Sequence, residues 1–384
     1  MKEKRILILS EAFGAGHTKA AEAIREGIQQ IDTEWKTDVV ELGVWLRPRL
    51  SQMISGIYLK TLRYSPKLWG ILYRRVQNRS VKPRVEFILH RMIYAQVIKL
   101  IRDYKPDVII ATHPFPSAVI SRLKRMGLNV PLHTVLTDYG AHGSWVSSGV
   151  DHYYLPSIQA KEQLMKLGVA EERLHVTGIP THPKFWEKHD KTLIRKKLGL
   201  DHRPTLLFMG GGMGIGLSEE MMDTFHQFRE EIQILIITGR NQRIYSSLTE
   251  NETYRHPNIH IFGFVENIDE LMDASDLLIT KPGGVTSAEA LTKQIPMIVL
   301  NPIPGQEEDN SLFIIRNQLG VSVNEINELK IFLQQFVENP SKLFAQIKPN
   351  NYRYTGKKVV EHLLHHIYTD RFVDTNRERE EIPS

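Results

Sequence analysis

The sequence predicts an α/β protein made of two doubly wound parallel sheets. Short β-rich runs alternate with helical runs along most of the chain, which is typical of a mostly parallel sheet with helices on both faces. The 384 residues exceed what one ordinary core requires and suit two such domains. The alternation is interrupted once, at 178–183, where glycine and proline cluster. We therefore expect the domain boundary there.

The expected division gives two domains, a further helix and a charged tail. The helix could return to the first domain, and the tail is expected to be loose. Ligands of such sheets bind outside the carboxyl ends of the strands, so we expect the domains to face each other across a cleft lined by the loops that follow strands. The expected ranges, in chain order, are 1–180, 181–345, 346–368 and 369–384.

Each expected element follows from its own run of residues. Apolar β-rich runs predict first-domain strands at 5–9, 36–42, 107–111, 132–136, 153–155 and 174–177. Helical spacing predicts helices at 18–30, at 85–102, in a stretch ending near 126 and at 157–167. After the boundary, strands are expected at 205–209, 233–238, 259–262, 277–280, 297–300 and 320–323. Helices lie between most of them, and a last helical run covers 357–366.

Composition limits the class of protein. Cysteine is absent, which excludes disulfides and thiolate metal sites and fits a reducing compartment. Ile6 to Leu9 are too few apolar residues for a signal-peptide core, and no run of 18 apolar residues occurs that would span a bilayer. We expect a cytoplasmic protein, peripheral on the inner face of the cell membrane.

The net charge of +5 is unevenly distributed. Residues 42–85 carry ten basic and no acidic side chains, which leaves +5 − 10 = −5 on the rest of the chain. This basic segment also contains Trp45 and Trp69 with several tyrosines, a mixture that suits an anionic membrane surface. The alternative is a solvated basic helix pair. We expect no nucleic-acid partner, because the body of the chain is acidic.

Two glycine-rich loops follow strands in the second domain and could hold a nucleotide diphosphate. Lys281-Pro282-Gly283-Gly284 comes after the strand at 277–280 and leads into a helix, where backbone N–H groups and the helix end favour negative charge. Glu289, one turn inside, could accept hydrogen bonds from ribose hydroxyls. The loop at 210–216 has five glycines but no Walker lysine; the alternative is a flexible strand–helix turn.

The first strand also leads into a glycine loop, which ends in His17. Gly14-Ala15-Gly16 lacks the third glycine of a dinucleotide fingerprint, since Lys19 occupies that position. Near a helix N-terminus the imidazolium is disfavoured, so His17 should be neutral and suited to act as a general base. The alternative is a capping or packing histidine.

Two further loops carry polar residues after strands. Gln306, Glu307 and Asn310 gather donors and acceptors suited to a polyhydroxylated ligand, although acidic N-capping would explain part of the pattern. Asp138, His142 and Trp145 could line an acceptor pocket, and His113 lies in a similar position. For the loop that contains Asp138, His142 and Trp145, and for the loop at His113, a purely structural role is at least as strong an alternative.

Missing motifs also narrow the chemistry. The sequence has no Asp-X-Asp pair, no His-Glu-x-x-His and no Gly-x-Ser-x-Gly. We expect no bound metal and no cofactor, with helix ends and backbone N–H groups stabilising a leaving diphosphate.

Taken together, these motifs resemble one enzyme family. Gly14-x-Gly16-His17, Thr137-Asp138, Lys281-Pro-Gly-Gly with Glu289, and Pro304-Gly-Gln-Glu-x-x-Asn310 resemble, in order and spacing, the monogalactosyldiacylglycerol synthase and processive diacylglycerol glucosyltransferase family. The resemblance extends from the first strand to about Leu363. It implies the GT-B fold, two Rossmann-like domains across a cleft, and inverting, metal-independent transfer of a hexose from a UDP-sugar to a membrane lipid such as diacylglycerol.

The resemblance also implies roles for individual residues. His17 would be the base, Glu289 would hold the ribose, and Phe264 would lie in the turn at the uracil. The residues facing the diphosphate would be Gly211, Gly212, Gly283, Gly284, Val285 and Thr286. The residues holding the donor sugar would be Gln306, Glu307 and Asn310. The basic segment matches the family's acceptor and membrane region by character and not by motif.

Other functions fit the same motifs. A transferase to a soluble acceptor, or a UDP-sugar epimerase, would keep the fold and change the chemistry. A non-catalytic UDP-sugar sensor would keep only binding. A nicotinamide enzyme fits poorly because the first fingerprint is incomplete. The sequence leaves open the sugar, the acceptor, the number of sugars added and the oligomeric state.

Overall fold

The computed structural model describes residues 3–11, 15–46, 83–210, 217–300, 302–303 and 305–380. Side chains are described in these ranges except at 83–93, 350 and 371–380. The chain divides into two compact units, one made of Met1–Pro183 with Tyr354–Ser384 and the other of Lys184–Arg353. The sequence analysis had placed the two divisions after residues 180 and 345.

The first unit contains a six-stranded parallel sheet in the order β2-β1-β3-β4-β5-β6. The strand order reverses between β1 and β3, and such a switch point is where open α/β sheets bind ligands. The strands are β1 (Lys4–Ser10), β2 (Trp35–Glu41), β3 (Val108–Ala111), β4 (Leu132–Val135), β5 (His152–Leu155) and β6 (Leu174–Val176).

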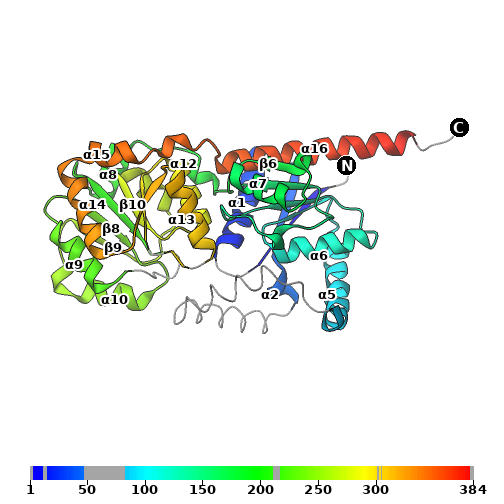
Figure 1. The fold of residues 1–384 in the computed structure, drawn as a ribbon, viewed down its shortest axis with the longest axis horizontal. Coiled ribbons are helices and arrows are strands. Elements are labelled where there is room, and N and C mark those ends of the chain that lie inside the picture. The colour runs from blue at the N-terminus through cyan, green and yellow to red at the C-terminus, as the bar shows by residue number, and fades with distance from the viewer. Residues whose placement is uncertain are drawn as a thin grey trace. The chain divides into compact units, whose positions relative to one another are not determined.

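Helices cover both faces of this sheet. Alternate strand residues such as Leu7, Ile109 and Tyr153 form a core with one set of helices, α5 (Pro83–Tyr104), α6 (Pro114–Arg125) and α7 (Ile158–Lys166). The other face is covered by α1 (Ala15–Ile31) and α16 (Gly356–Glu380), which pack on each other (Figure 1). A short helix, α2 (Leu42–Leu46), follows β2, and a 3₁₀ turn, η1 (Gly143–Trp145), follows β4.

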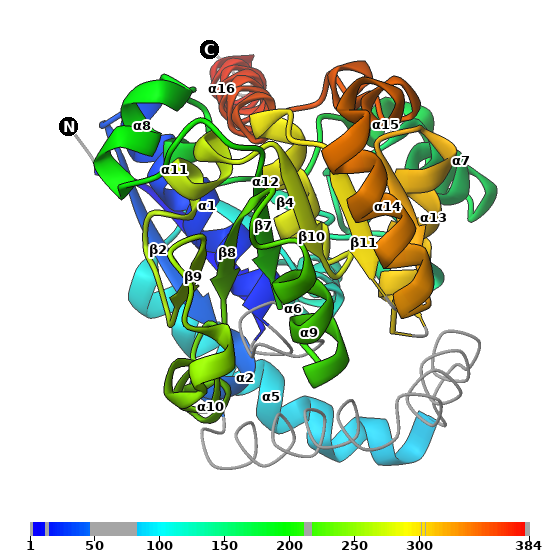
Figure 2. The same ribbon diagram turned by 90° about the vertical axis from the view of Figure 1, so that its left-hand side faces the viewer.

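The second unit contains another six-stranded parallel sheet, in the order β12-β11-β10-β7-β8-β9 (Figure 2). The order reverses between β7 and β10, as in a dinucleotide-binding fold. The strands are β7 (Thr205–Met209), β8 (Gln233–Ile237), β9 (Ile259–Phe262), β10 (Leu277–Thr280), β11 (Met297–Leu300) and β12 (Gly320–Val323).

Both faces of the second sheet are also buried. One core joins the strands to α9 (Glu219–Gln227), α10 (Gln242–Glu250), α14 (Ile326–Glu338) and α15 (Pro340–Gln346). Three further helices pack in series, namely α8 (Lys191–Leu198), α11 (Ile268–Ala274) and α12 (Gly284–Lys293). Helix α13 (Gln306–Arg316) packs against β12. The α/β prediction with two doubly wound sheets is confirmed.

Two tight glycine contacts fix where the last helix rejoins the first unit. Gly178 has a φ of +105°, a backbone conformation that favours glycine, and a Cβ there would lie 3.1 Å from the carbonyl carbon of Tyr354. A Cβ on Gly356 would lie 2.3 Å from the backbone nitrogen of Thr181. Only glycines allow the two chain segments to approach this closely.

Helix α16 differs from its expected extent. The sequence analysis expected a loose tail from residue 369, but α16 continues to Glu380. Its buried residues Val360, Leu363 and Ile367 lie on one helix face, and Tyr368 accepts a hydrogen bond from Trp35 Nε1 at 3.2 Å. None of the helices within the described ranges is both long and apolar enough to cross a membrane.

Candidate active site

His17 lies at the switch point of the first sheet. It is the third residue of α1, which follows β1, and Thr112 and His113 follow the neighbouring strand β3. The ring of His17 is 7% exposed, and its centroid lies 4.6 Å from that of His113. The carboxyl ends of two adjacent strands therefore bring two imidazoles together. The sequence analysis considered only His17 as the general base.

Hydrogen bonds define the tautomer of His17. Its Nδ1 lies 2.9 Å from the carbonyl oxygen of Thr112 and 2.7 Å from the hydroxyl of Thr137. A carbonyl oxygen only accepts, so Nδ1 must carry the proton and donate it. In the neutral ring, Nε2 then bears a lone pair. The same orientation is given to catalytic histidines by a partner on the opposite nitrogen.

The electrostatics keep His17 neutral. Burial lowers the pKa of His17, and the charge of Asp138 and the Thr112 carbonyl oppose that effect in part. Burial likewise lowers the pKa of His142 to about 4 and that of His113 well below its usual range. The lowered pKa of His17 agrees with the neutral ring expected from the sequence. The sequence analysis attributed the neutral ring to the helix N-terminus, whereas burial is the largest cause of the shift.

The other acceptor-side residues lie beside His17 after β4. Trp145 is 1% exposed and belongs to the core, with its ring 6.4 Å from that of His17 and 6.3 Å from that of His142. Its indole therefore lies between the hydrophobic core and the rings of His17 and His142. His142 is half-buried and its Nδ1 lies 2.6 Å from the Ser144 hydroxyl. His113 accepts a hydrogen bond from the backbone N–H of Phe115 and caps α6.

The second unit presents the N-terminus of α12 at its own switch point. Gly283 is the N-cap residue, with φ −70° and ψ 137°, and no side chain caps the helix. Among the described residues, a Cβ built on Gly283 would meet no heavy atom within 4 Å. The first N–H groups of a helix, here those of Gly284, Val285 and Thr286, have no intrahelical acceptor. Such N–H groups suit an anionic group.

Buried side chains support this loop. Asn310 is fully buried, and its amide donates a hydrogen bond to the Pro282 carbonyl at 3.0 Å, which ties α13 to the loop before α12. Glu289 is 6% exposed on α12. The sequence analysis gave Asn310 to the donor sugar, whereas this bond commits one of its N–H groups to positioning the loop.

The start of α13 is held by its own carboxylates. Glu307 accepts a hydrogen bond from the Ile303 N–H at 2.8 Å, and Glu308 accepts one from the Gly305 N–H at 3.0 Å. Gly305 has a φ of +111°. Gln306 and Glu307 are half-buried at the first turn. Capping, the alternative considered above, therefore accounts for one oxygen of Glu307.

Phe264 follows β9 at the edge of the second sheet and is 59% exposed. The guanidinium carbon of Arg240 lies 5.0 Å from its ring centroid, so a cation covers the aromatic face. The sequence analysis did not single out Arg240, which lies three residues after the end of β8. Gly211 and Gly212 lie outside the described residues, as do Gly14 and most of the basic segment 42–85.

Comparisons with known proteins identify the family. Residues 17–181 match the family described as Monogalactosyldiacylglycerol (MGDG) synthase, and residues 205–353 match the Glycosyltransferase family 28 C-terminal domain. A protein from Bacillus licheniformis named processive diacylglycerol beta-glucosyltransferase is 31% identical over 350 residues, covering 91% of this chain and 88% of that relative. The chain belongs to this glucosyltransferase family. The resemblance drawn from the motifs is confirmed.

Further comparisons agree. A protein of the same name from Bacillus subtilis is 30% identical over 328 residues, 85% of each chain. Among solved structures, MurG from Acinetobacter baumannii has a TM-score of 0.64 with 14% identity and covers 95% of this chain and 99% of its own. UDP-GlcNAc 2-epimerase from Neisseria meningitidis, bound to UDP-GlcNAc, has a TM-score of 0.59 with 14% identity, covering 95% and 100%.

These likenesses show the GT-B fold, and family membership makes the chain a glycosyltransferase. The fold alone is shared by a structure named glycosyltransferase, from Rickettsia africae (TM-score 0.51), and by an epimerase, so it does not separate the alternatives raised by the sequence. The sequence relatives favour the transferase over the epimerase and the sensor, because they are named glucosyltransferases.

Proposed function

We propose that this enzyme transfers a hexosyl group, with inversion and with no metal ion taking part in the reaction, from a UDP-sugar to diacylglycerol. The observation that carries the mechanism is the fixed tautomer of His17: Nδ1 donates to the Thr112 carbonyl, which leaves a lone pair on Nε2. The names of the relatives supply the acceptor class and make UDP-glucose the first donor to test. We assign the acceptor to the first unit and the donor to the second.

The acceptor hydroxyl is activated by proton removal. As the hydroxyl oxygen of diacylglycerol forms its bond to the anomeric carbon, its proton passes to Nε2 of His17. Because burial lowers the pKa of His17, the ring is available as a base at neutral pH. The Thr112 carbonyl and the Thr137 hydroxyl then face the Nδ1–H of the imidazolium that forms.

The leaving group is stabilised by the start of α12. The bond between the anomeric carbon and the diphosphate oxygen breaks, and the electron pair leaves with UDP. Backbone N–H groups at 284–286 and the positive end of the helix favour that negative charge. This charge stabilisation supports a reaction that needs neither a metal nor a cofactor.

A single displacement also determines the stereochemistry. His17 offers a base and no carboxylate nucleophile, so attack on the face opposite the diphosphate inverts the anomeric carbon. An α-linked UDP-hexose would give a β-glycoside, in keeping with the "beta" in the relatives' names.

The acceptor places the reaction at a membrane surface. We propose that the basic segment 42–85, with ten basic and no acidic residues, binds anionic lipid on the cytoplasmic face. At about 1 kcal/mol for each basic residue near anionic lipid, five engaged charges would hold the protein there.

One assay tests the proposal. The protein is incubated with UDP-glucose, UDP-galactose or UDP-GlcNAc and with diacylglycerol in anionic vesicles, with and without EDTA. Mass spectrometry should detect a hexosyldiacylglycerol, NMR should show a β-anomeric coupling, and EDTA should leave the rate unchanged. A product formed only on a water-soluble acceptor, an epimerised UDP-sugar or an α-linked product would each contradict the proposal.

A further inference from the structure

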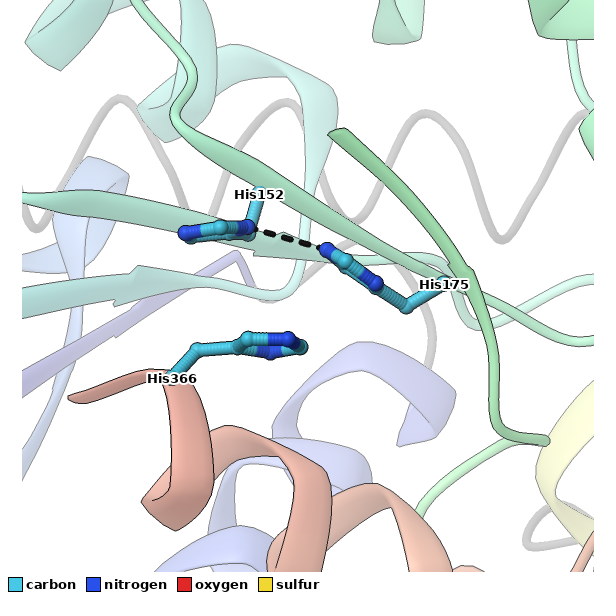
Figure 3. A group of neighbouring side chains, drawn as sticks. All are labelled: His152, His175 and His366. Carbon is cyan, nitrogen blue, oxygen red and sulfur yellow. Dashed lines mark hydrogen bonds between the residues drawn. The ribbon is translucent and has the colours of Figure 1, made fainter. Parts of the chain in front are cut away.

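A second group of histidines lies away from His17, on the opposite half of the same sheet. His133 on β4 pairs in register with His152 on β5, and Tyr154 on β5 pairs with His175 on β6. These side chains share the sheet face that α16 covers, and α16 adds His366 (Figure 3). Nothing in the proposed transfer reaction uses these residues.

Three of these imidazoles converge at metal-binding distances. One ligand nitrogen from each of His152, His175 and His366 lies within 4.8 Å of the others. Nδ1 of His152 lies 2.9 Å from Nε2 of His175, and the ring centroids of His175 and His366 lie 4.1 Å apart. All three residues are half-buried, coming from two strands and a helix that is far away in sequence.

Contacts on the far side of the His152 and His366 rings orient their lone pairs inward. Nε2 of His152 lies 3.3 Å from Asp370 Oδ2, and a carboxylate only accepts, so the proton of His152 belongs on Nε2 and its lone pair on Nδ1. This is the carboxylate–histidine arrangement found behind many metal ligands. Nε2 of His175 donates a hydrogen bond to Nδ1 of His152, and on metal binding that proton would move to Nδ1 of His175.

A chain of hydrogen bonds gives His366 the matching tautomer. Its Nδ1 lies 2.9 Å from the Tyr154 hydroxyl, which lies 2.9 Å from Nδ1 of His133. Nε2 of His133 in turn lies 3.6 Å from Asp370 Oδ2, an electrostatic contact that is too long for a hydrogen bond but favours a proton on Nε2. Nδ1 of His133 then accepts from Tyr154, and Tyr154 accepts from Nδ1 of His366, so Nε2 of His366 keeps its lone pair.

We propose that His152, His175 and His366 bind a divalent transition metal ion, Zn²⁺ or an ion of similar softness, that fastens α16 to the edge of the first sheet. Three imidazoles suit Zn²⁺, whereas Ca²⁺ and Mg²⁺ take oxygen ligands. With metal–nitrogen distances of about 2.0–2.1 Å, tetrahedral ligands lie roughly 3.4 Å apart. On metal binding, side-chain rotation would lengthen the 2.9 Å distance between His152 Nδ1 and His175 Nε2 and bring the His366 ring closer to both. The fourth coordination position would be taken by water, because Asp370 faces Nε2 of His152, on the side of that ring away from the ion.

A competing site on α16 must be separated in the test. His362 and His366 are four residues apart on one helix, a spacing at which two imidazoles can bind a metal on the helix surface without the sheet. His362 and His365 are both exposed. The variants His362→Gln and His365→Gln are therefore the controls for His152→Gln and His175→Gln.

The experiment titrates the chelator-treated full-length protein with Zn²⁺ by calorimetry and with Co²⁺ by absorption spectroscopy. Wild type should bind one ion with a tetrahedral Co²⁺ spectrum, and Zn²⁺ should raise its melting temperature. His152→Gln and His175→Gln should weaken binding about 10-fold or more, while His362→Gln and His365→Gln leave it unchanged. Asp370→Leu, which removes both acceptor oxygens, should weaken it by about 10- to 100-fold by releasing the His152 tautomer.

Three results would overturn the proposal. They are the absence of a saturable one-to-one isotherm in wild type, binding that survives in His175→Gln, and binding lost in His362→Gln but kept in His152→Gln. Circular dichroism of each variant shows whether it is folded. His175 lies on the edge strand and is half-buried, so its replacement should be tolerated.

Discussion

Replacing Gly283 by alanine should separate donor binding from the stability of the fold. The native φ of −70° and ψ of 137° are allowed for alanine, and the new methyl group would meet no heavy atom of the described residues within 4 Å. The N-cap preference costs alanine a few tenths to about 1 kcal/mol, and the stiffer unfolded chain returns about 0.4–1 kcal/mol. We expect the free energy of unfolding to change by less than about 1 kcal/mol.

The effect on the donor should be much larger. The methyl group would project into the space before the first N–H groups of α12, where we place the diphosphate. A displacement of about 1 Å costs on the order of 100-fold in rate, and a tenfold loss in affinity corresponds to about 1.4 kcal/mol. UDP affinity should therefore fall at least tenfold, with a matching rise in KM for the UDP-sugar.

The assay combines calorimetry with UDP, initial rates at varied UDP-sugar concentration and urea unfolding. Gly143→Ala, in the first unit, is the matched control, because a Cβ there also meets nothing within 4 Å in the part of the chain that the structure describes. Its UDP affinity should equal that of wild type. Unchanged UDP affinity in Gly283→Ala would refute the placement of the diphosphate, and a large loss of stability would refute the steric argument.

Three other predictions follow from the same sites. Glu289→Gln keeps the volume of a buried side chain but removes its charge, so KM for the UDP-sugar should rise about tenfold. An unchanged KM would show that Glu289 has no role in donor binding. Because burial lowers the pKa of His17, kcat/KM should hold at pH 6.5 and decline only below it; an acid limb above pH 6.5 would contradict the assignment. Lys293→Met should lower the free energy of unfolding, measured in urea, by about 3–5 kcal/mol, because the buried carboxylate of Asp273 loses the Lys293 ammonium, 2.5 Å away in the native protein. A loss below about 1 kcal/mol would show that His189, 2.8 Å from the same carboxylate, is a sufficient partner.

The strands were predictable because each is a short apolar run whose periodicity is local. The expected strand at 205–209 is observed at the same residues, and the one at 5–9 is extended by one residue at each end. The loops that follow strands could also be found, since parallel strands bring their carboxyl ends to one edge. The glycine loop at 281–284 was expected to lead into a helix with Glu289 one turn inside, and α12 begins at Gly284.

The remaining features depend on contacts between distant residues. The bond from Asn310 to the Pro282 carbonyl joins residues 28 apart, and no local pattern separates such a role from sugar binding. The histidine group required the register that pairs His133 with His152 and the return of α16. The sequence does show a histidine in each of three successive strands, but only the strand order shows that these strands are neighbours in the sheet.

The most direct test of the account compares His17→Gln with His113→Gln in the transfer assay with UDP-glucose and diacylglycerol vesicles. The two rings lie 4.6 Å apart, but we assign the base to His17, whose Nδ1 donates to Thr112, while His113 Nδ1 accepts the capping N–H of Phe115. We expect His17→Gln to lose about 10²- to 10⁴-fold in kcat with UDP affinity unchanged, and His113→Gln to lose far less. Wild-type turnover in His17→Gln would contradict the account.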